Sequence, residues 1–233
     1  VSGIYNETVN QKAFNQTNQG TDGDFFQWAY FHFARMSFST PGWWAPEVKD
    51  ADGKSVGNAE ANFLAWAEQE GVNDVFVPWT SIDHPDFPGQ KVEVGGISPF
   101  AMYNPPFSKV SEIADEHTAF ILKLADMQPK LEFLNVKTEK LGNGLTRITA
   151  DLFNNSPLPT HSQLGERSRW LRKVRVDISK DADDLVAGEK KQLIRSIGAF
   201  EKASVSWIVK GGGNVDIKAG AAHTGFATLN VKL

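Results

Sequence analysis

The spacing of the hydrophobic residues changes at Pro129, and this change constrains the fold more than any other feature of the sequence. Before the proline, residues 108–127 repeat apolar side chains every three or four positions, which predicts an amphipathic helix that Pro129 ends. After it, apolar and polar residues alternate in short runs, as they do in strands with one buried face. The sequence therefore predicts two domains, 1–129 and 130–233.

Region 130–233 has the pattern of an all-β, Ig-like antiparallel sandwich. Its alternating runs are separated by turn sequences rich in Gly and Asn, above all Gly142-Asn143-Gly144 and Gly211–Asn214. The runs occupy residues 131–136, 147–152, 170–178, 205–209, 215–219 and 227–231. About seven short strands over roughly 100 residues are typical of such a sandwich.

Region 1–129 mixes helix and strand signals, which predicts part of an α/β domain. Residues 25–33 are apolar all round, so we expect a buried helix there, followed by a strand at 35–40. Asn58 is placed to cap a second helix. A short strand at 75–77 precedes residues 80–106, whose Pro and Gly content predicts a long ordered loop.

Charge and composition exclude several classes of protein. The net charge of −4 divides into 7 basic and 17 acidic residues in 1–129, against 17 basic and 11 acidic in 130–233, which favours two units with different surfaces. Neither region is basic enough to favour nucleic acid as a partner. Cysteine is absent, which excludes disulfides and Cys-based zinc sites. The sequence has no run long and apolar enough for a membrane span, and its start has neither Met nor a signal-peptide pattern, so we expect a trimmed piece of a longer chain.

Residue spacing alone predicts no active site. The five histidines lack the short ligand spacing of zinc sites, and no Gly-x-Ser-x-Gly elbow is present. We expect His161-Ser162 to lie in a surface turn, Asp83–Asp86 to form a locally hydrogen-bonded turn, and His117 to pack on its helix. Trp43 and Trp44 are either core residues or a stacking platform for peptide or sugar.

Residues 23–40 nevertheless resemble a known family. Gly23-Asp24, the helix pattern Trp28-Ala29-Tyr30 and the strand Ser37–Thr40 resemble the last part of the catalytic domain of carboxypeptidase A-like zinc metallopeptidases. Further segments resemble a loop of bacterial members, the helix that closes the domain and a β-rich extension: Val77–Trp79, Asp83–Pro85, Val92–Gly96, Asn104–Pro106, 108–127 and Leu158–Thr160. Together they cover roughly residues 20–165 in the family's order.

The resemblance implies roles for particular residues. The family's catalytic Glu falls on Pro41, and its substrate-clamping Tyr falls near Thr17–Gln19, where no Tyr stands. Glu47 is the nearest acidic replacement for the catalytic residue. Phe26 corresponds to the bottom of the pocket for the substrate's C-terminal side chain, with Ser39 on the adjacent strand. Trp43 and Trp44 complete the expected substrate-binding set, and the family's zinc ligands lie upstream of the matching segment.

The function implied is that of the C-terminal part of a secreted or periplasmic bacterial zinc metallocarboxypeptidase-like hydrolase. Zinc belongs to the parent protein and none is expected in this chain, which is expected to be inactive alone. The implied partners are a peptide or protein substrate and the missing N-terminal peptidase half, with no nucleic acid and no membrane span. The alternative is a non-catalytic, degenerate peptidase scaffold whose β-sandwich binds peptide or surface glycan.

Overall fold

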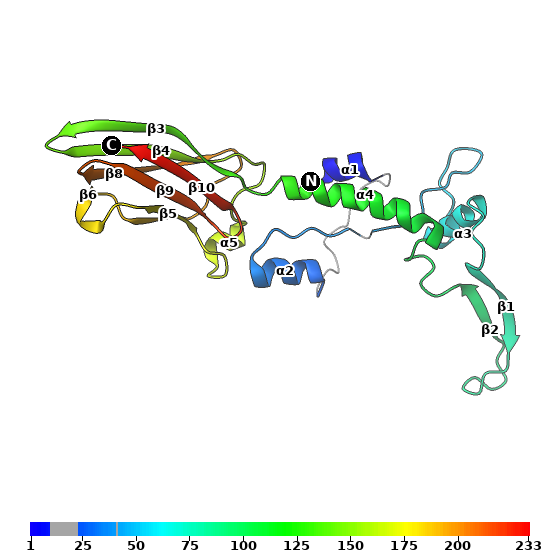
Figure 1. The fold of residues 1–233 in the computed structure, drawn as a ribbon. Helices are drawn as coiled ribbons and strands as arrows, with labels where there is room; N and C mark the ends of the chain where they lie inside the picture. Colours follow the sequence, from blue (N-terminus) through cyan, green and yellow to red (C-terminus); the bar gives the residue numbers. More distant parts are fainter. Residues whose placement is uncertain (10–22, 41) are drawn as a thin grey trace. The chain divides into compact units, whose positions relative to one another are not determined.

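The computed structural model of the chain describes residues 1–9, 23–40 and 42–233. Within these residues the fold combines three antiparallel sheets with a few helices (Figure 1). The chain divides into two compact units. The first unit comprises Val1–Asn15 and Thr40–Lys123, and the second comprises Gln16–Ser39 and Leu124–Leu233. Each unit is described by itself.

The first unit contains short helices, one hairpin and most of one long helix. Its elements are α1 (Ser2–Thr8), α3 (Ala59–Gln69), β1 (Phe76–Ile82), β2 (Val92–Ile97) and α4 (Phe107–Asp126), whose last three residues belong to the second unit. Asn58 caps α3 as predicted, because its side chain accepts a hydrogen bond from the Ala61 N–H at 2.9 Å. The helix predicted at 108–127 is confirmed as α4. A small core contains Trp43, Val48, Phe63, Trp66 and Ala67.

The prediction of a loop over residues 80–106 is wrong where β1 and β2 pair. The two strands form an antiparallel hairpin in which Phe76 lies opposite Ile97. Gly95 lets the two backbones approach, since a Cβ atom there would lie 2.7 Å from the Trp79 Cα. The indole of Trp79 lies over Gly96, where an added Cβ would be 3.2 Å from the ring. The glycines that permit this contact also removed the alternation that identifies strands in a sequence.

The second unit consists of two four-stranded antiparallel sheets and two helices (Figure 1). One sheet has the order β3-β4-β8-β6 and the other β10-β9-β5-β7. The strands are β3 (Leu131–Gly142), β4 (Leu145–Asn154), β5 (Val174–Ile178), β6 (Leu185–Ala187), β7 (Lys191–Ile194), β8 (Lys202–Lys210), β9 (Asn214–Ala221) and β10 (Gly225–Lys232). The helices are α2 (Phe25–Phe33) and α5 (Gln163–Arg167), with a single 3-10 turn at Ala182–Asp184.

The two sheets share one hydrophobic core. Along β8, Val205, Trp207 and Val209 are buried while the residues between them are more exposed, as the alternation predicts. The same cluster includes Ile148 of β4 and Ile217 of β9, so side chains from both sheets meet in it. Burying each such side chain contributes about 1.5–3 kcal/mol. The Trp207 indole N–H donates to the Glu189 carbonyl at 2.9 Å, so the largest core residue has no unpaired polar group.

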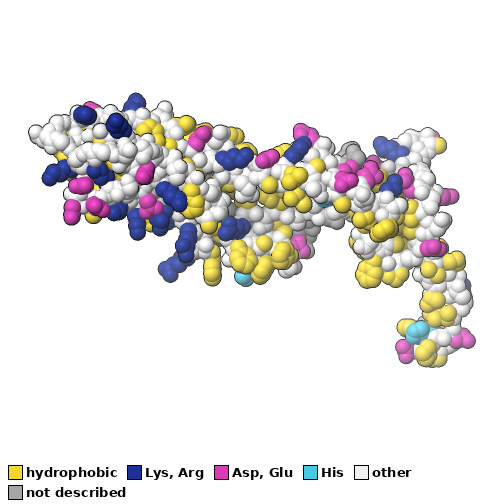
Figure 2. All heavy atoms as spheres, in the orientation of Figure 1, with side chains coloured by type: hydrophobic (Ala, Val, Ile, Leu, Met, Phe, Trp, Pro, Cys, Tyr) yellow, Lys and Arg dark blue, Asp and Glu magenta, His cyan; other side chains and the backbone are white. Residues whose placement is uncertain are grey.

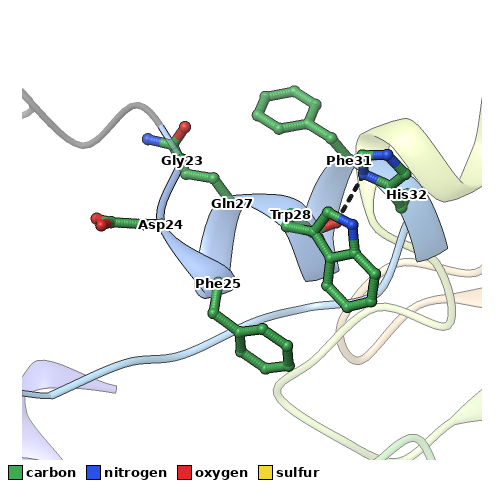
Figure 3. A pocket seen from close by; sticks show the side chains of 7 residues that line it. All are labelled: Gly23, Asp24, Phe25, Gln27, Trp28, Phe31 and His32. Carbon is green, nitrogen blue, oxygen red and sulfur yellow. Dashed lines mark hydrogen bonds between the residues drawn. The ribbon is translucent and has the colours of Figure 1, made fainter.

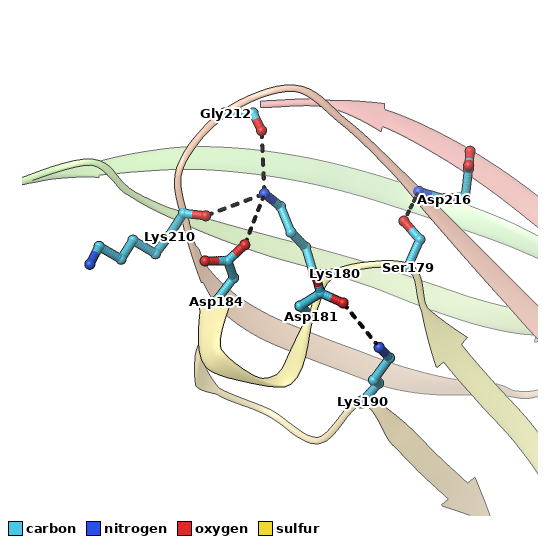
Figure 4. A network of polar contacts seen from close by, with 8 residues as sticks. All are labelled: Ser179, Lys180, Asp181, Asp184, Lys190, Lys210, Gly212 and Asp216. Carbon is cyan, nitrogen blue, oxygen red and sulfur yellow. Dashed lines mark hydrogen bonds and ion pairs between the residues drawn. The ribbon is translucent and has the colours of Figure 1, made fainter.

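Polar contacts join the turns at one end of the sheets (Figure 4). The Lys180 ammonium donates to the carbonyls of Lys210 and Gly212, both at 3.3 Å, and lies 3.8 Å from the Asp184 carboxylate. Nearby, the Ser179 hydroxyl accepts from the Asp216 N–H at 2.9 Å. These bonds fix the turn after β5 against the predicted β8–β9 turn, which is confirmed at residues 211–213.

Two predictions for residues 25–40 are wrong. Residues 34–40 form no strand, and the structure pairs no other strand with them. An extended segment needs such a partner for its backbone hydrogen bonds if it is to form a strand. Helix α2 forms where it was expected, but none of its nine side chains is buried. Pro41 and Thr17–Gln19 lie outside the described residues.

We predict that a fragment from Lys130 to Leu233 folds alone as a β protein, because the shared core lies within it. Circular dichroism should show strand content and a cooperative thermal transition. The midpoint should be lower than that of the second unit in the full chain, since the fragment lacks the contact that Ala34 makes with Ser162. A disordered NMR spectrum of the fragment would contradict this prediction.

Candidate functional site

Helix α2 presents an exposed aromatic surface. Phe25 is 77% exposed and Phe31 is 65% exposed, although large aromatic side chains normally lie inside a protein. Trp28 is stacked on Phe25, with ring centroids 5.3 Å apart, and meets Phe33 edge to face at 5.0 Å. Figure 2 shows hydrophobic side chains gathered over this helix. We call the exposed rings of Phe25, Trp28, Phe31 and Phe33 the α2 aromatic surface.

A shallow cavity of about 390 Å³ lies along this helix (Figure 3). The residues that line it are Gly23, Asp24, Phe25, Gln27, Trp28, Phe31 and His32. The His32 Nδ1–H donates to the Trp28 carbonyl at 3.2 Å, within the helix itself. Phe26, predicted to form the bottom of a substrate pocket, is on the same helix and 37% exposed. Ser39 is exposed in the extended segment that follows.

The end of α2 is attached to the sheets through a buried contact. Ala34 ends the helix in a left-handed conformation, with φ of 54°. The Ser162 hydroxyl donates to the Ala34 carbonyl at 2.7 Å. It also accepts from the Gly165 N–H at 2.9 Å, which caps α5. Gly165 allows this approach, because a Cβ there would lie 3.0 Å from the Ala34 oxygen and 2.6 Å from Leu171. We call Ala34, Ser162, Gly165 and Leu171 the α2 attachment.

The prediction that His161-Ser162 forms a surface turn is therefore wrong, because both residues are buried. The Thr160 hydroxyl accepts from the Ile197 N–H at 2.9 Å and lies within hydrogen-bond distance of His161 Nδ1, at 3.0 Å. The opposite nitrogen, Nε2, donates to the Arg172 carbonyl at 3.1 Å. These partners fix the orientation of the His161 ring. The role of His161 is structural. The sequence pattern did not reveal the hydrogen-bond partners that its ring nitrogens have in the fold.

His223, in the turn between β9 and β10, stands against His161. The two rings meet edge to face with centroids 4.8 Å apart. Burial, together with the charges of His161 and Arg35, lowers the pKa of His223 below its ordinary value. Its Nε2 atom is buried and has no hydrogen-bond partner, so a proton there would be poorly solvated. The lowered pKa favours the neutral form of His223.

Other predicted site residues lie in the first unit. Trp43 is buried and meets Trp66 edge to face, with centroids 5.4 Å apart. Trp44 is half-buried. Glu47 accepts a short hydrogen bond from the Ser55 hydroxyl across a small turn, in which Lys49 pairs with Ser55. Glu47 is thus engaged within its own turn. The structure places Trp43 and Glu47 in one unit and Phe26 and Ser39 in the other.

A second cavity, of about 190 Å³, lies within the first unit. Trp43 and Trp66 line it together with a side of α4. At its rim the Lys109 ammonium lies 2.8 Å from the Glu70 carboxylate, and this hydrogen bond raises the pKa of Lys109. His117 also lines the cavity and donates from Nδ1 to the Ile113 carbonyl at 2.9 Å. The expected packing role of His117 agrees with its edge-to-face contact with Tyr5.

The local turn predicted at Asp83–Asp86 is present. The His84 ring accepts from the Asp86 N–H at 3.2 Å, and Phe87 N–H donates to the His84 carbonyl at 3.1 Å. Over residues 1–9, 23–40 and 42–233, no group of three His, Cys, Asp or Glu side chains could hold a metal ion. Among the helices in those ranges, none combines the length and apolar character that crossing a bilayer requires.

Comparisons with known proteins concern the β-rich region. Residues 130–232 match a family model described as a domain of unknown function (DUF8731). No curated protein matches the chain. Solved structures with local similarity include the β-glucosidase DesR of Streptomyces venezuelae in complex with D-glucose, a GH3 β-glucosidase of Bifidobacterium adolescentis, and β-glucosidase 3B of Thermotoga neapolitana in complex with α-D-glucose.

These similarities are partial. The identities are 14%, 16% and 10%, over 45%, 44% and 45% of this chain, with TM-scores of 0.23, 0.21 and 0.22. The matched part of this chain spans 15%, 17% and 16% of those proteins. Similarity at this level carries no functional argument.

We predict that acid weakens the second unit through His223. The lowered pKa means that the neutral ring stabilises the fold above pH 6.5, the ordinary value for His, and that this stability is lost as the pH falls through the folded pKa. Thermal unfolding should therefore show a smaller acid-induced drop in midpoint for His223→Gln than for the natural chain. His32→Gln, on exposed α2, is the matched control and should keep the full drop. An equal drop in all three proteins would refute the role of His223.

Proposed function

We propose that this chain is the C-terminal part of a secreted or periplasmic zinc metallocarboxypeptidase-like protein. The observation that carries the proposal is the α2 aromatic surface. A nine-residue helix is marginal in water without tertiary packing, and this one has no buried side chain. Its aromatic rings therefore call for a further protein surface to cover them. In the family that residues 23–40 resemble, this helix lies inside the catalytic domain, which would supply that surface.

The finer description of the fold belongs to the same proposal. Residues 1–129 would be the last part of a carboxypeptidase-like α/β domain, and residues 130–233 an Ig-like sandwich. The strand orders support the second assignment, because β3-β4-β8-β6 corresponds to the ABED sheet of such sandwiches and β10-β9-β5 to their GFC sheet, with β7 added beside β5. The hallmark cysteines are absent, and the buried Trp207 is on β8 rather than on the third strand.

Zinc does not fit the residues that the structure describes in this chain, because no set of three candidate ligands comes together there. We therefore assign the metal to the part of the parent protein that precedes the resemblance and derive no step through it here. What this chain would contribute is shape: Phe26 of α2 would form an apolar wall for the substrate's last side chain. Ser39, in the same unit, would add a polar contact to the peptide, whereas Trp43 is buried in the core of the first unit.

A second candidate function is a non-catalytic scaffold that binds peptide or surface glycan. Two observations favour it. Pro41 stands at the position of the family's catalytic Glu, and a proline has no group that accepts a proton. The nearest acidic residue, Glu47, is hydrogen-bonded to Ser55. In this reading the peptidase domain keeps its peptide-binding cleft and has lost the base that activates water.

The two functions are separated by comparing this chain with the longest product of its gene. We expect the longer protein to hold stoichiometric zinc after dialysis and to remove C-terminal residues from peptides, while this chain does neither. Metal analysis and mass spectrometry of the peptides give the readouts. Stoichiometric binding of zinc by this chain alone would contradict the assignment of the metal to another part of the parent protein. A longer protein that binds peptide ends without cleaving them would support the scaffold instead.

Phe26 predicts an apolar preference in the longer protein. A Leu or Phe side chain gains about 1.5–3 kcal/mol on burial, whereas a Lys head against Phe26 would be an unpaired charge. Peptides ending in Phe or Leu should therefore compete better than those ending in Lys or Glu. Phe26→Asp should improve the Lys-ended peptide roughly tenfold or more relative to the Phe-ended one.

The matched control is Phe100→Asp, which introduces the same change at an exposed phenylalanine of the first unit. It should leave the order of the peptides unchanged. Preference of the natural protein for the Lys-ended peptide would reject the role given to Phe26.

A further inference from the structure

The last residue of α5 and the loop that joins α5 to β5 concentrate positive charge around one tryptophan. The cations Arg167, Arg169, Arg172 and Lys173 occur within seven residues, and all four are exposed. None of them has an ion-pair partner among the residues that the structure describes. The nearby Glu166 does not neutralise them, because it accepts from the Ser196 hydroxyl at 2.6 Å and lies 3.5 Å from Arg195. We call residues 167–173 the basic loop.

The fold holds the basic loop with its tryptophan outward. Trp170 is 75% exposed, while its neighbour Leu171 is 6% exposed and packs in the α2 attachment against Gly165. The Arg172 carbonyl is fixed by the hydrogen bond from the buried His161 ring. Before Trp170, the Ser168 N–H donates to the Leu164 carbonyl at 2.9 Å. The backbone is therefore anchored on both sides of Trp170, and the exposure of the indole follows from the fold.

The chemistry of the loop matches the interfacial region of a lipid bilayer. Tryptophan is enriched at membrane–water interfaces, where its ring reaches the acyl boundary and its N–H stays hydrated. Clustered Lys and Arg side chains are attracted to anionic headgroups, by about a factor of five in binding for each residue near the surface. Figure 2 shows Lys and Arg side chains gathered at the α5 end of the sheets.

We propose that the basic loop binds the surface of an anionic phospholipid bilayer, with Trp170 in the interface and the four cations on headgroup phosphates. A single-stranded nucleic acid is bound along a groove by several stacking rings, whereas this loop offers one ring and projects from the sheets (Figure 1). The flat, deformable surface of a bilayer therefore fits a single projecting ring better than a single-stranded nucleic acid does. The inference goes beyond the proposed peptidase function and does not rest on it.

The test is co-sedimentation of the full chain with vesicles. Vesicles of equal parts phosphatidylcholine and phosphatidylglycerol should bind the chain, and vesicles of phosphatidylcholine alone should not. The double variant Arg169→Gln with Arg172→Gln should bind roughly thirty-fold more weakly, since two cations near the surface are lost. Acyl-chain bromine in the vesicles should quench part of the tryptophan fluorescence of the natural chain and less of it in Trp170→Phe.

The control is Lys137→Gln with Lys140→Gln, which removes two exposed charges from β3 and should leave binding within about two-fold. Circular dichroism and the thermal midpoint verify that each variant is folded. Equal binding to both kinds of vesicle, an equal loss in the control, or unchanged quenching in Trp170→Phe would overturn the proposal. Binding to heparin or single-stranded DNA without binding to the anionic vesicles would also overturn it and assign the loop to a soluble polyanion.

Discussion

Burial of the inward-facing side chains between two four-stranded sheets is the interaction on which the second unit depends. Trp207 lies in the centre of this core, and its indole N–H is paired with a backbone carbonyl, so the largest buried residue carries no polar penalty. The core fixes where the connections between strands emerge. One of these connections contains Thr160, His161 and Ser162, whose side chains are fully used in hydrogen bonds to Ile197, Arg172 and Ala34.

That connection joins two features of opposite character. Through Ser162 it holds the end of α2, a helix whose apolar rings remain exposed. On its outer side it positions the basic loop, whose charges have no partners in the described residues. Both features are unfavourable when only water covers them, because exposed aromatic rings and clustered like charges lower stability or solubility. Each feature becomes favourable when a suitable partner covers it. The α2 aromatic surface requires an apolar partner, and the basic loop requires an anionic one.

Six of the eight strands in residues 130–233 coincide with predicted runs, most clearly β4, β8 and β9, where alternation in the sequence mirrors burial in space. Strands β6 and β7 lie outside those runs. The long helix at 108–127 was predictable for the same reason with a different period. Prediction failed where tertiary contacts override local pattern. The β1–β2 hairpin needs Gly95 against Trp79, and glycines carry no hydrophobic signal. Residues 35–40 have strand-like composition, but the structure pairs no strand with them.

The candidate sites show the same limit more sharply. The rings of residues 25–33 could be read from the sequence, but their exposure could not, since an apolar helix normally indicates burial. His161 and Ser162 look like a polar surface dipeptide and are buried, because partners from distant segments satisfy them. The resemblance supplied roles for Phe26 and Pro41 that spacing alone does not contain.

Charge illustrates why the fold is needed to find a surface. A sequence count gives residues 130–233 a clear excess of basic side chains but treats them as equivalent. The structure divides them: Arg147 lies 2.8 Å from Glu139 on the neighbouring strand, and Lys202 lies 2.6 Å from the Asp151 carboxylate. The hydrogen bond from Lys202, with further bonds from Ser204 and Asn135, holds the pKa of the Asp151 carboxyl well below the usual range. The charges of Arg147 and Lys202 are compensated by carboxylates of the same sheet. Those of the basic loop are not, so they keep their attraction for an anion outside the chain. A patch is therefore defined by which charges the fold leaves uncompensated, and that property depends on strand register as much as on composition.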